Sequence, residues 1–452
     1  MSFDQIASLV VLVAVVALMV QGKMRADVVA LLGAAVLLVL GVVRPVEVQG
    51  AFASPAVIAL AGLFVIAYAI ELSGLLGLLI RQATRLSSRI GALGIWLVIG
   101  LCGSVGGFLN NTPVVVLAAP VIRDVARSLG LSPKRFLMPL SHVTVMGGLL
   151  TLIGTSTNLL VNDMARNAGQ PVFGMFEITP VGFVIACAGG VWLYIVGARQ
   201  LGKAAAREEG DGAPSANAAR ADITIRLGEA RNQPDGSGDA RLGDVALYRA
   251  ADRPFRLKPA LLSFCVFAAV IAAAAMGWAP IAAAAFAGAV SLIILKVITP
   301  DEAYAGLRPE ILLLIAGMVV IGTAIEVTGL AEAAAGQLIH VIRPLGPFGA
   351  LAVLYGVTLF ATELLSNATV AVLMTPIAVA IAESLGVDPR PFLVAVMMAA
   401  SAAFATPFGY QTNVLVYKMG GYRYLDFVRV GLPLNLVTWA AAMAAIPPFF
   451  PF

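Results

Sequence analysis

Four short polar stretches interrupt long apolar runs in this sequence, and they hold the residue types best suited to chemistry. They are Asn110-Asn111-Thr112, Gly154-Thr155-Ser156-Thr157-Asn158, Ser366-Asn367-Ala368-Thr369 and Thr406-Pro407-Phe408-Gly409-Tyr410-Gln411-Thr412-Asn413. A break in a helix frees carbonyl oxygens at the end of one half-helix and N–H groups at the start of the next. The carbonyl groups suit a cation such as Na⁺, and the N–H groups suit an anion. The pattern predicts a site for an anion flanked by cations.

Taken alone, each break is equally compatible with a kink whose Thr and Asn side chains cap the helix ends. The breaks come in two pairs with matched spacing, however, and the match extends along the chain at an offset of 256 residues, or 255 after a one-residue slip. The offset pairs Asn111 with Asn367, Pro120 with Pro376, Gly130 with Gly386, Pro133 with Pro389, Gly154 with Gly409 and Glu71 with Glu326. Two unrelated apolar stretches would share leucines and valines, and not matched asparagine, proline, glycine and glutamate residues. The repeat favours a functional site.

Each half is predicted to contain the same series of elements. Three membrane spans come first, at 6–22, 27–43 and 54–73, and again at 260–277, 280–298 and 310–328. An amphipathic arm comes next, at 75–89 in the first half and 330–343 in the second. Two apolar limbs follow, at 91–109 with 113–128 and at 347–365 with 370–385. Each half then ends with an interrupted helix (135–165; 391–418) and a last span (177–197; 426–447). The two limbs could be ordinary spans. The polar tip between them leaves no room for a solvated loop, which favours a re-entrant hairpin buried at mid-membrane depth.

This series gives five crossings per half, and an odd number inverts the second half relative to the first. The predicted fold class is an all-α polytopic membrane protein of two inverted repeats, each with five transmembrane helices, one re-entrant hairpin and one broken helix. The predicted domains are an N-terminal repeat at 1–198, a cytoplasmic linker at 199–258 and a C-terminal repeat at 259–452.

Composition and charge agree with a membrane protein. Of 452 residues, 60% are hydrophobic and 12% are charged, whereas soluble proteins use about 25% charged residues. With the linker in the cytoplasm, most basic loop residues lie inside and only Arg44, Arg166, Arg343 and Arg390 lie outside. This positive-inside bias predicts that both chain ends lie on the outer side of the membrane. The predicted location of the protein is the inner (plasma) membrane. Basic residues form no single stripe, so the net charge of +4 does not suggest a nucleic-acid partner.

The paired motifs resemble the divalent anion–sodium symporter family, and within it the sulfate-permease-like and citrate-transporter-like bacterial branch. The resemblance covers nearly the whole chain except 199–258. It implies that Asn111 and Thr112 with Gly154 and Asn158 form one half-site, and that Ser366 and Asn367 with Thr406, Gly409 and Asn413 form the other. Two positions depart from the family pattern: Asn110 replaces a serine and Ala368 replaces a threonine. Thr369 could supply the hydroxyl lost at Ala368, or the substrate could differ.

The candidate residues follow from the motifs and the resemblance together. The candidate substrate-binding residues are Asn110, Asn111, Thr112, Thr157, Asn158, Ser366, Asn367, Thr369, Thr412 and Asn413. The candidate cation ligands are Asn111, Gly154, Asn158, Asn367, Thr406, Gly409 and Asn413. Glu363 is the candidate coupling residue, because a carboxylate inside the membrane is a functional candidate by default; the alternative is a helix cap. His142 is expected to be a satisfied core residue, and Glu71 and Glu326 are expected to anchor the arms.

The leading hypothesis is a secondary active transporter that couples uptake of a small anion, such as sulfate or a di- or tricarboxylate, to Na⁺ by alternating access. The alternative is an oxyanion efflux permease or a proton-coupled anion antiporter of the same superfamily. An intramembrane enzyme is disfavoured, because the sequence offers no His-Glu metal spacing and no Gly-x-Ser-x-Gly motif. No cofactor is expected beyond Na⁺ as coupling ion. The expected partners are the small anion, Na⁺ or H⁺, the lipid bilayer and, by analogy with relatives, a second copy in a homodimer.

Overall fold

The structure is a computed structural model that describes residues 2–21, 24–75, 77–78, 82, 91–202, 255–330, 343–407 and 409–452. The predicted arms and the linker at 199–258 lie largely outside the described residues. The first half contains α1 (Phe3–Gln21), α2 (Ala26–Val39), α3 (Pro45–Phe52), α4 (Pro55–Leu72), α6 (Ala92–Gly106), α7 (Asn111–Ser128), α8 (Lys134–Gly147), α9 (Ser156–Asn167), α10 (Thr179–Trp192) and a π-helical continuation, η1 (Leu193–Gly197).

The second half repeats this order. It contains α14 (Leu257–Ala275), α15 (Ile281–Ile294), α16 (Pro300–Gly306), α17 (Pro309–Val327), the short η2 (Arg343–Leu345), α19 (Gly346–Ala361), α20 (Asn367–Leu385), α21 (Arg390–Ala400), α22 (Gln411–Gly420) and α23 (Tyr424–Phe449). Among the described residues, six helices are long and apolar enough to cross a membrane. The prediction of an all-α membrane fold is confirmed. The inversion of one half relative to the other stays a prediction.

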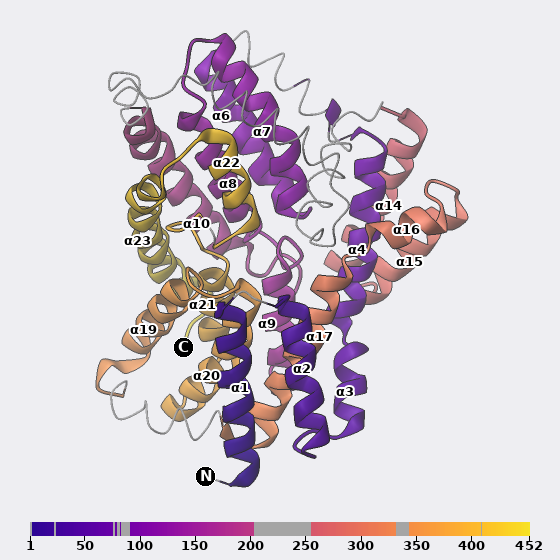
Figure 1. Cartoon of the computed structure of the whole chain (residues 1–452), viewed down its shortest axis with the longest axis vertical. Helices are drawn as coiled ribbons and strands as arrows, with labels where there is room; N and C mark the ends of the chain where they lie inside the picture. The colour runs from indigo at the N-terminus through magenta and orange to yellow at the C-terminus, as the bar shows by residue number, and fades with distance from the viewer. Residues whose placement is uncertain are drawn as a thin grey trace.

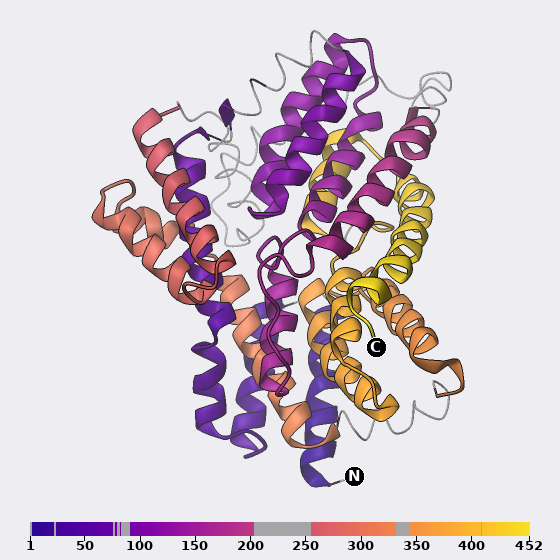
Figure 2. The ribbon, with the colours of Figure 1, turned by 180° about the vertical axis from the view of Figure 1, so that it is seen from behind.

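The helices pack as two groups (Figures 1 and 2). The scaffold group comprises α1–α4 and α14–α17, in which α4 packs on α15 and α2 packs on α17. The core group comprises α6–α10 and α19–α23, in which α6 packs on α8 and α19 packs on α21. Within the core group the halves are interleaved, since α7 contacts α22 and α20 contacts α9. In Figure 1, α6 and α7 occupy the upper part of the core group, and α19 and α20 the lower part.

Four irregular segments lie inside the core group, at the places where the sequence predicted them. Tip 1 (residues 107–110) joins α6 to α7, and tip 2 (362–366) joins α19 to α20. Break 1 (148–155) separates α8 from α9, and break 2 (401–410) separates α21 from α22.

Side-chain caps explain where three of the helices that follow these tips and breaks, α7, α9 and α20, begin. The side chains of Asn110, Thr155 and Ser366 accept hydrogen bonds from the N–H groups of Thr112, Thr157 and Thr369.

Two short helices that the sequence analysis did not predict complete the scaffold group. α3 and α16 each start with a proline at the first helical position, where the missing N–H has no cost. The predicted span at 27–43 is shorter in the structure, because α2 ends at Val39 and Gly41 adopts a positive φ of 73° that terminates the helix.

Candidate functional site

At the centre of the core group, tip 1 and break 1 are joined by hydrogen bonds between side chains and main chain. The Thr151 hydroxyl donates to the Gly107 carbonyl and accepts from the Gly154 N–H at 3.1 Å. The Asn158 amide nitrogen donates to the carbonyls of Thr151 at 3.0 Å and Gly148 at 3.4 Å. A buried break needs such partners, because each unpaired backbone group in an apolar environment costs several kcal/mol.

The same bonds recur between tip 2 and break 2. The Thr406 hydroxyl donates to the Glu363 carbonyl at 3.3 Å and accepts from the Gly409 N–H at 3.1 Å. The Asn413 amide nitrogen donates to the carbonyls of Ala403 at 2.9 Å and Thr406 at 3.2 Å. The motif match therefore corresponds to matched contacts, and Gly154, Asn158, Thr406, Gly409 and Asn413 all take part in holding the breaks.

Oxygen atoms crowd together where tip 1 meets break 1. A Cβ added to Gly154 would lie 2.5 Å from the Gly148 carbonyl oxygen and 2.9 Å from that of Gly107, so only glycine fits. A Cβ on Gly148 would lie 3.2 Å from both the Gly154 oxygen and the Asn111 side chain. The Oδ1 atoms of Asn111 and Asn158 are buried and have no hydrogen-bond partner among the described residues. A buried amide oxygen that accepts no hydrogen bond is an atom that a bound Na⁺ ion would satisfy.

Asn367, which the repeat pairs with Asn111, also has an unpartnered amide oxygen if its amide group is flipped, so that its oxygen and nitrogen exchange places. The Thr362 hydroxyl lies 2.7 Å from Asn367 Oδ1 and 2.8 Å from the Ala400 carbonyl oxygen, but it has only one hydrogen to donate. Asn367 Nδ2 is buried without a partner in the described part of the chain. Turning the amide lets Nδ2 donate to Thr362, and Thr362 to Ala400. Asn367 Oδ1 then becomes the unpartnered oxygen, as in Asn111.

Glu363, the candidate coupling residue, is held by four donors. Its Oε1 accepts from the N–H groups of Phe404 at 2.8 Å and Ala405 at 2.7 Å and from the Asn435 amide at 2.7 Å. Its Oε2 accepts from the Thr406 N–H at 2.9 Å. The carboxylate thus binds the freed N–H groups of break 2, which is the cap that the sequence analysis kept as the alternative. At the corresponding position of tip 1 stands Gly107.

Contacts between the halves join the start of α7 to the end of break 2 and the start of α22. Asn111 Nδ2 donates to the Tyr410 hydroxyl at 3.2 Å, and the Thr112 hydroxyl donates to the Gln411 amide oxygen at 3.3 Å. The Ser141 hydroxyl lies 2.7 Å from both Thr412 Oγ1 and Asn413 Oδ1. The two half-sites therefore share one polar interior.

A cavity of about 50 Å³ adjoins this interior on the side of α4. Its polar lining comes from Asn110, Gly154, Thr155, Ser156 and Tyr410. Of the candidate substrate-binding residues, Asn110 is the one in this lining. Thr157, Thr369, Thr412 and Asn413 are at most 2% exposed, and Ser366 shares a hydrogen bond with Thr369 at 2.6 Å. Thr369 also donates to the Met19 sulfur at 3.1 Å, so its hydroxyl is already engaged.

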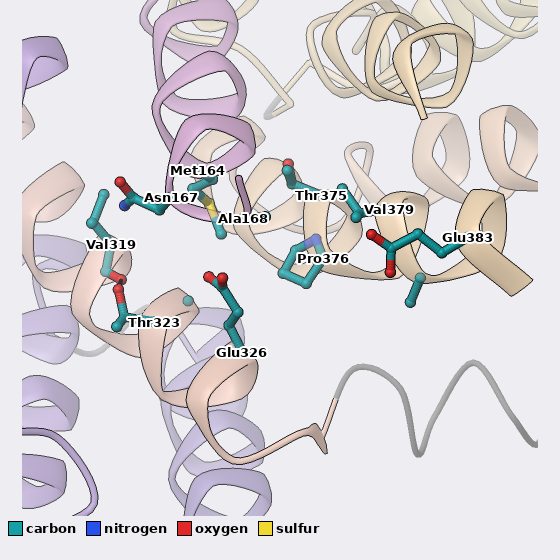
Figure 3. Close-up of a pocket in the computed structure, with 12 residues that line it drawn as sticks. Met164, Asn167, Ala168, Val319, Thr323, Glu326, Thr375, Pro376, Val379 and Glu383 are labelled. Atoms are coloured by element: carbon teal, nitrogen blue, oxygen red, sulfur yellow. Dashed lines mark hydrogen bonds between the residues drawn. The ribbon is translucent and has the colours of Figure 1, made fainter. Parts of the chain in front are cut away.

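A second cavity, of about 90 Å³, lies away from both tips, between α9, α17 and α20 (Figure 3). Glu326 and Glu383 flank it, together with Thr323 and Asn167. Glu326 lies in the last turn of α17, near the span end where it was predicted. This cavity lies between α17 of the scaffold group and α9 and α20 of the core group, and none of the candidate site residues lines it.

His142 departs from expectation. It is fully buried, but neither ring nitrogen has a hydrogen-bond partner among the described residues. It packs instead against the rings of Phe404, at 5.1 Å between centroids, and Phe427, at 5.9 Å. The prediction of a satisfied core histidine is therefore wrong in its hydrogen bonding and correct in its burial.

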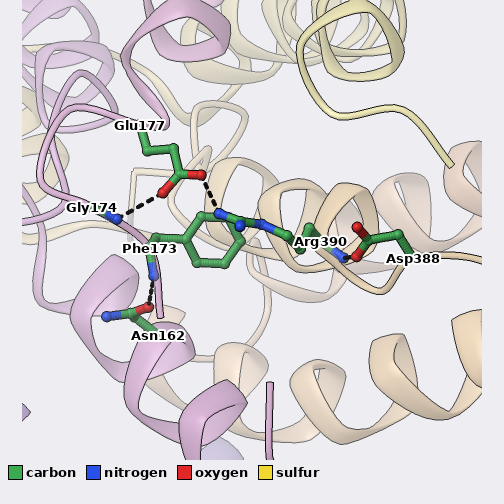
Figure 4. Close-up of polar contacts among 6 residues, drawn as sticks. All are labelled: Asn162, Phe173, Gly174, Glu177, Asp388 and Arg390. Carbon is green, nitrogen blue, oxygen red and sulfur yellow. Dashed lines mark hydrogen bonds and ion pairs between the residues drawn. The ribbon is translucent and has the colours of Figure 1, made fainter. Parts of the chain in front are cut away.

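Outside the polar interior, the ends of the core helices are tied across the halves. Arg390 at the start of α21 pairs with Glu177, which also accepts from the Gly174 N–H at 2.8 Å (Figure 4). The Arg390 guanidinium lies 4.7 Å from the centre of the Phe173 ring. At the corresponding start of α8, the Tyr422 hydroxyl donates to the Lys134 carbonyl and accepts from the Met138 N–H at 2.8 Å. Both broken helices are thus anchored to the opposite half.

Thr151, Ser141, Tyr410 and Gln411 are contact residues that the candidate lists did not contain. Thr151 aligns with Thr406 at the same 255-residue offset that aligns Gly154 with Gly409. The repeat in the sequence could therefore have identified Thr151 as a candidate. The contacts of Ser141, Tyr410 and Gln411 join segments 271 to 299 residues apart, which a repeat pattern alone does not place together.

A helical membrane fold in which two tips pack against two broken helices is typical of membrane transporters. Among the described residues, no cluster of three His, Cys, Asp or Glu side chains could hold a catalytic metal. The chain belongs to the citrate transporter family, whose family model matches residues 15–389 and 364–451.

Several similar proteins are named as transporters. An uncharacterized transporter from Synechocystis is 26% identical, with 91% of each chain covered. The uncharacterized transporter YfbS of Escherichia coli is 23% identical over the full length of both chains. Sodium/sulfate cotransporter 1 of Chlamydomonas reinhardtii is 35% identical over 30% of this chain and 16% of its own length. The YdaH transporter of Alcanivorax borkumensis shares the fold, with a TM-score of 0.57 at 14% identity, covering 88% of this chain and 86% of its own.

Proposed function

We propose that this transporter is a Na⁺-coupled symporter for a small divalent anion, acting in the inner (plasma) membrane. The observation that carries the proposal is the pair of buried amide oxygens, Asn111 Oδ1 and Asn158 Oδ1, that have no hydrogen-bond partner among the described residues. A Cβ added to Gly106 would lie 2.9 Å from Asn111 Oδ1 and 2.8 Å from the Thr144 carbonyl oxygen, so this amide oxygen lies next to a main-chain oxygen. Oxygens without donors are suited to a bound cation. The partial match to a sodium/sulfate cotransporter supports the same coupling ion.

The anion is proposed to bind in the cavity lined by Asn110, Thr155, Ser156 and Tyr410, whose side chains offer hydrogen-bond donors. Its volume of about 50 Å³ gives room for roughly three to five water-sized groups. That size suits an anion such as sulfate, with four oxygens, better than a tricarboxylate. The cation sites next to it would offset the charge of a divalent anion and link the binding of the two.

The test is uptake of labelled sulfate, succinate and citrate into proteoliposomes. We expect an inward Na⁺ gradient to drive uptake, with sulfate the best substrate of the three. The competing function is a proton-coupled antiporter or an oxyanion efflux permease. Uptake that follows a proton gradient and ignores Na⁺ would favour that alternative and contradict Na⁺ symport.

A further inference from the structure

Arg308 lies in the connection between α16 and α17, at the edge of the scaffold group that faces tip 1. Gly306, two residues earlier, packs against α4 so closely that a Cβ there would lie 2.8 Å from Tyr68 Cβ. α17 starts at Pro309, so Arg308 occupies the N-cap position of a 19-residue helix. The main chain that carries Arg308 is therefore fixed on both sides.

The Arg308 side chain reaches a small cavity of about 40 Å³ that it shares with Tyr68, Glu71, Asn110 and Pro113. Asn110, Phe64 and Ala67 line both this cavity and the one beside Thr155 and Ser156, so the two adjoin at Asn110. Arg308 therefore lines a cavity that adjoins the proposed anion site.

Arg308 is the one basic residue among the described residues that line the two cavities. No ion pair joins it to a carboxylate in the described part of the chain, while Glu71, the acidic residue of the lining, has an interaction of its own. An arginine keeps a fixed positive charge and presents a fork of N–H donors that matches an oxyanion.

Asn110 adds a second donor at the same point. Its Oδ1 accepts from the Thr112 N–H at 3.1 Å, and its Nδ2 group remains a donor for another partner. A guanidinium and an amide that line the same cavity both offer N–H donors, which are complementary to the oxygens of a sulfate or a carboxylate. The N-terminus of α17 contributes its partial positive charge to the same region.

We propose that Arg308 is the residue that makes this transporter select anions, by binding the substrate together with Asn110 where it enters or leaves the site. The inference rests on the proposed function and adds to it a specificity-determining residue outside the repeated motifs. Residue 53, which the 255-residue offset pairs with Arg308, is an alanine, so the anion contact would exist on one side of the site only.

The experiment compares the wild type with Arg308→Gln, Arg308→Lys and the control Arg429→Gln, an exposed arginine of α23. Labelled sulfate uptake into proteoliposomes gives KM and Vmax, and sulfate-induced thermal stabilisation of the detergent-purified protein gives binding without transport. We expect Arg308→Gln to raise KM and the apparent Kd for sulfate about tenfold or more. Arg308→Lys should fall in between, since it keeps the charge and loses the fork. Arg429→Gln should match the wild type.

Three results would decide against the proposal in distinguishable ways. If Arg308→Gln folds normally and keeps the wild-type KM and Kd, Arg308 does not bind the anion although the proposed function stands. If both Arg308 variants lose folded protein and Vmax equally while KM is unchanged, Arg308 has a purely structural role. If the wild-type protein neither binds nor transports sulfate, succinate or citrate, the proposed function fails and the inference fails with it.

Discussion

Both carboxylate oxygens of Glu363 accept hydrogen bonds, so replacing one of them by an amide group changes more than the charge. In Glu363→Gln, an NH₂ group must face either the Thr406 N–H or the donors at Phe404, Ala405 and Asn435. A lost acceptor for a buried donor costs about 1–3 kcal/mol. We therefore expect a lower melting temperature and a proportional loss of exchange and gradient-driven uptake.

The measurement is a melting curve together with both transport assays, and Glu383→Gln in α20 is the control. Glu383 makes one long contact, 3.5 Å from Gln170, so its variant should melt like the wild type. A Glu363→Gln protein that melts normally, exchanges substrate and loses only gradient-driven uptake would show that Glu363 carries the coupling charge instead.

Asn111 and Asn367 provide the second prediction at the scale of the residue. Asn111→Ala and Asn367→Ala each remove an amide oxygen from a proposed cation site. We expect the Na⁺ concentration for half-maximal sulfate uptake to rise about tenfold or more in each variant. Asn167→Ala, an exposed asparagine beside the distant cavity of Figure 3, is the control. Unchanged Na⁺ dependence in both asparagine variants would make Asn111 and Asn367 structural residues only.

At the scale of the element, small residues let helices press against the breaks. A Cβ on Gly182 of α10 would lie 2.2 Å from the Leu149 carbonyl oxygen in break 1. Overpacking of this kind costs about 1–3 kcal/mol, so Gly182→Ala should lower the melting temperature and the uptake rate. Gly190 of the same helix has no atom within 4 Å of its added Cβ. Gly190→Ala should be neutral or stabilising; equal behaviour of the two variants would contradict the packing argument.

Helix positions in the core group were predictable, because polar tips and breaks stand out against apolar sequence. The limbs predicted at 91–109 and 113–128 appear as α6 and α7, with Asn110 serving as the cap between them. α3 and α16 were not predictable from hydropathy, since at eight and seven residues they are too short to show an apolar run. The contact of Ser141 with Thr412 and Asn413 depends on how the halves pack, and no local pattern encodes it.

At the scale of the whole molecule, the alternating-access hypothesis predicts that the core group moves against the scaffold group. A Cβ on Gly322 of α17 would lie 2.5 Å from the Met164 methyl group of α9, so this pair bridges the two groups. In a background without Cys102, Cys187 and Cys265, we expect a short thiol crosslinker to stop uptake in Met164→Cys/Gly322→Cys and reduction to restore it.

The control pair is Gln5→Cys/Thr328→Cys, within the scaffold group, where Gln5 Nε2 donates to the Thr328 carbonyl at 3.0 Å. Crosslinking this pair should leave uptake intact. Full uptake by a completely crosslinked Met164→Cys/Gly322→Cys protein would rule out relative motion of the two groups at this contact.

The interleaving of the halves also constrains how the protein is made. Ser141 bonds to residues 271 and 272 positions later in the chain. At 5–20 residues per second, the ribosome needs roughly 14–54 s to reach them. During that interval the first half is already inserted, but the Ser141 hydroxyl and the Lys134 carbonyl lack the hydrogen-bond partners that the second half supplies. We therefore expect a stage in the biogenesis of this transporter at which water or an insertion chaperone forms hydrogen bonds with these polar groups, because lipid chains cannot.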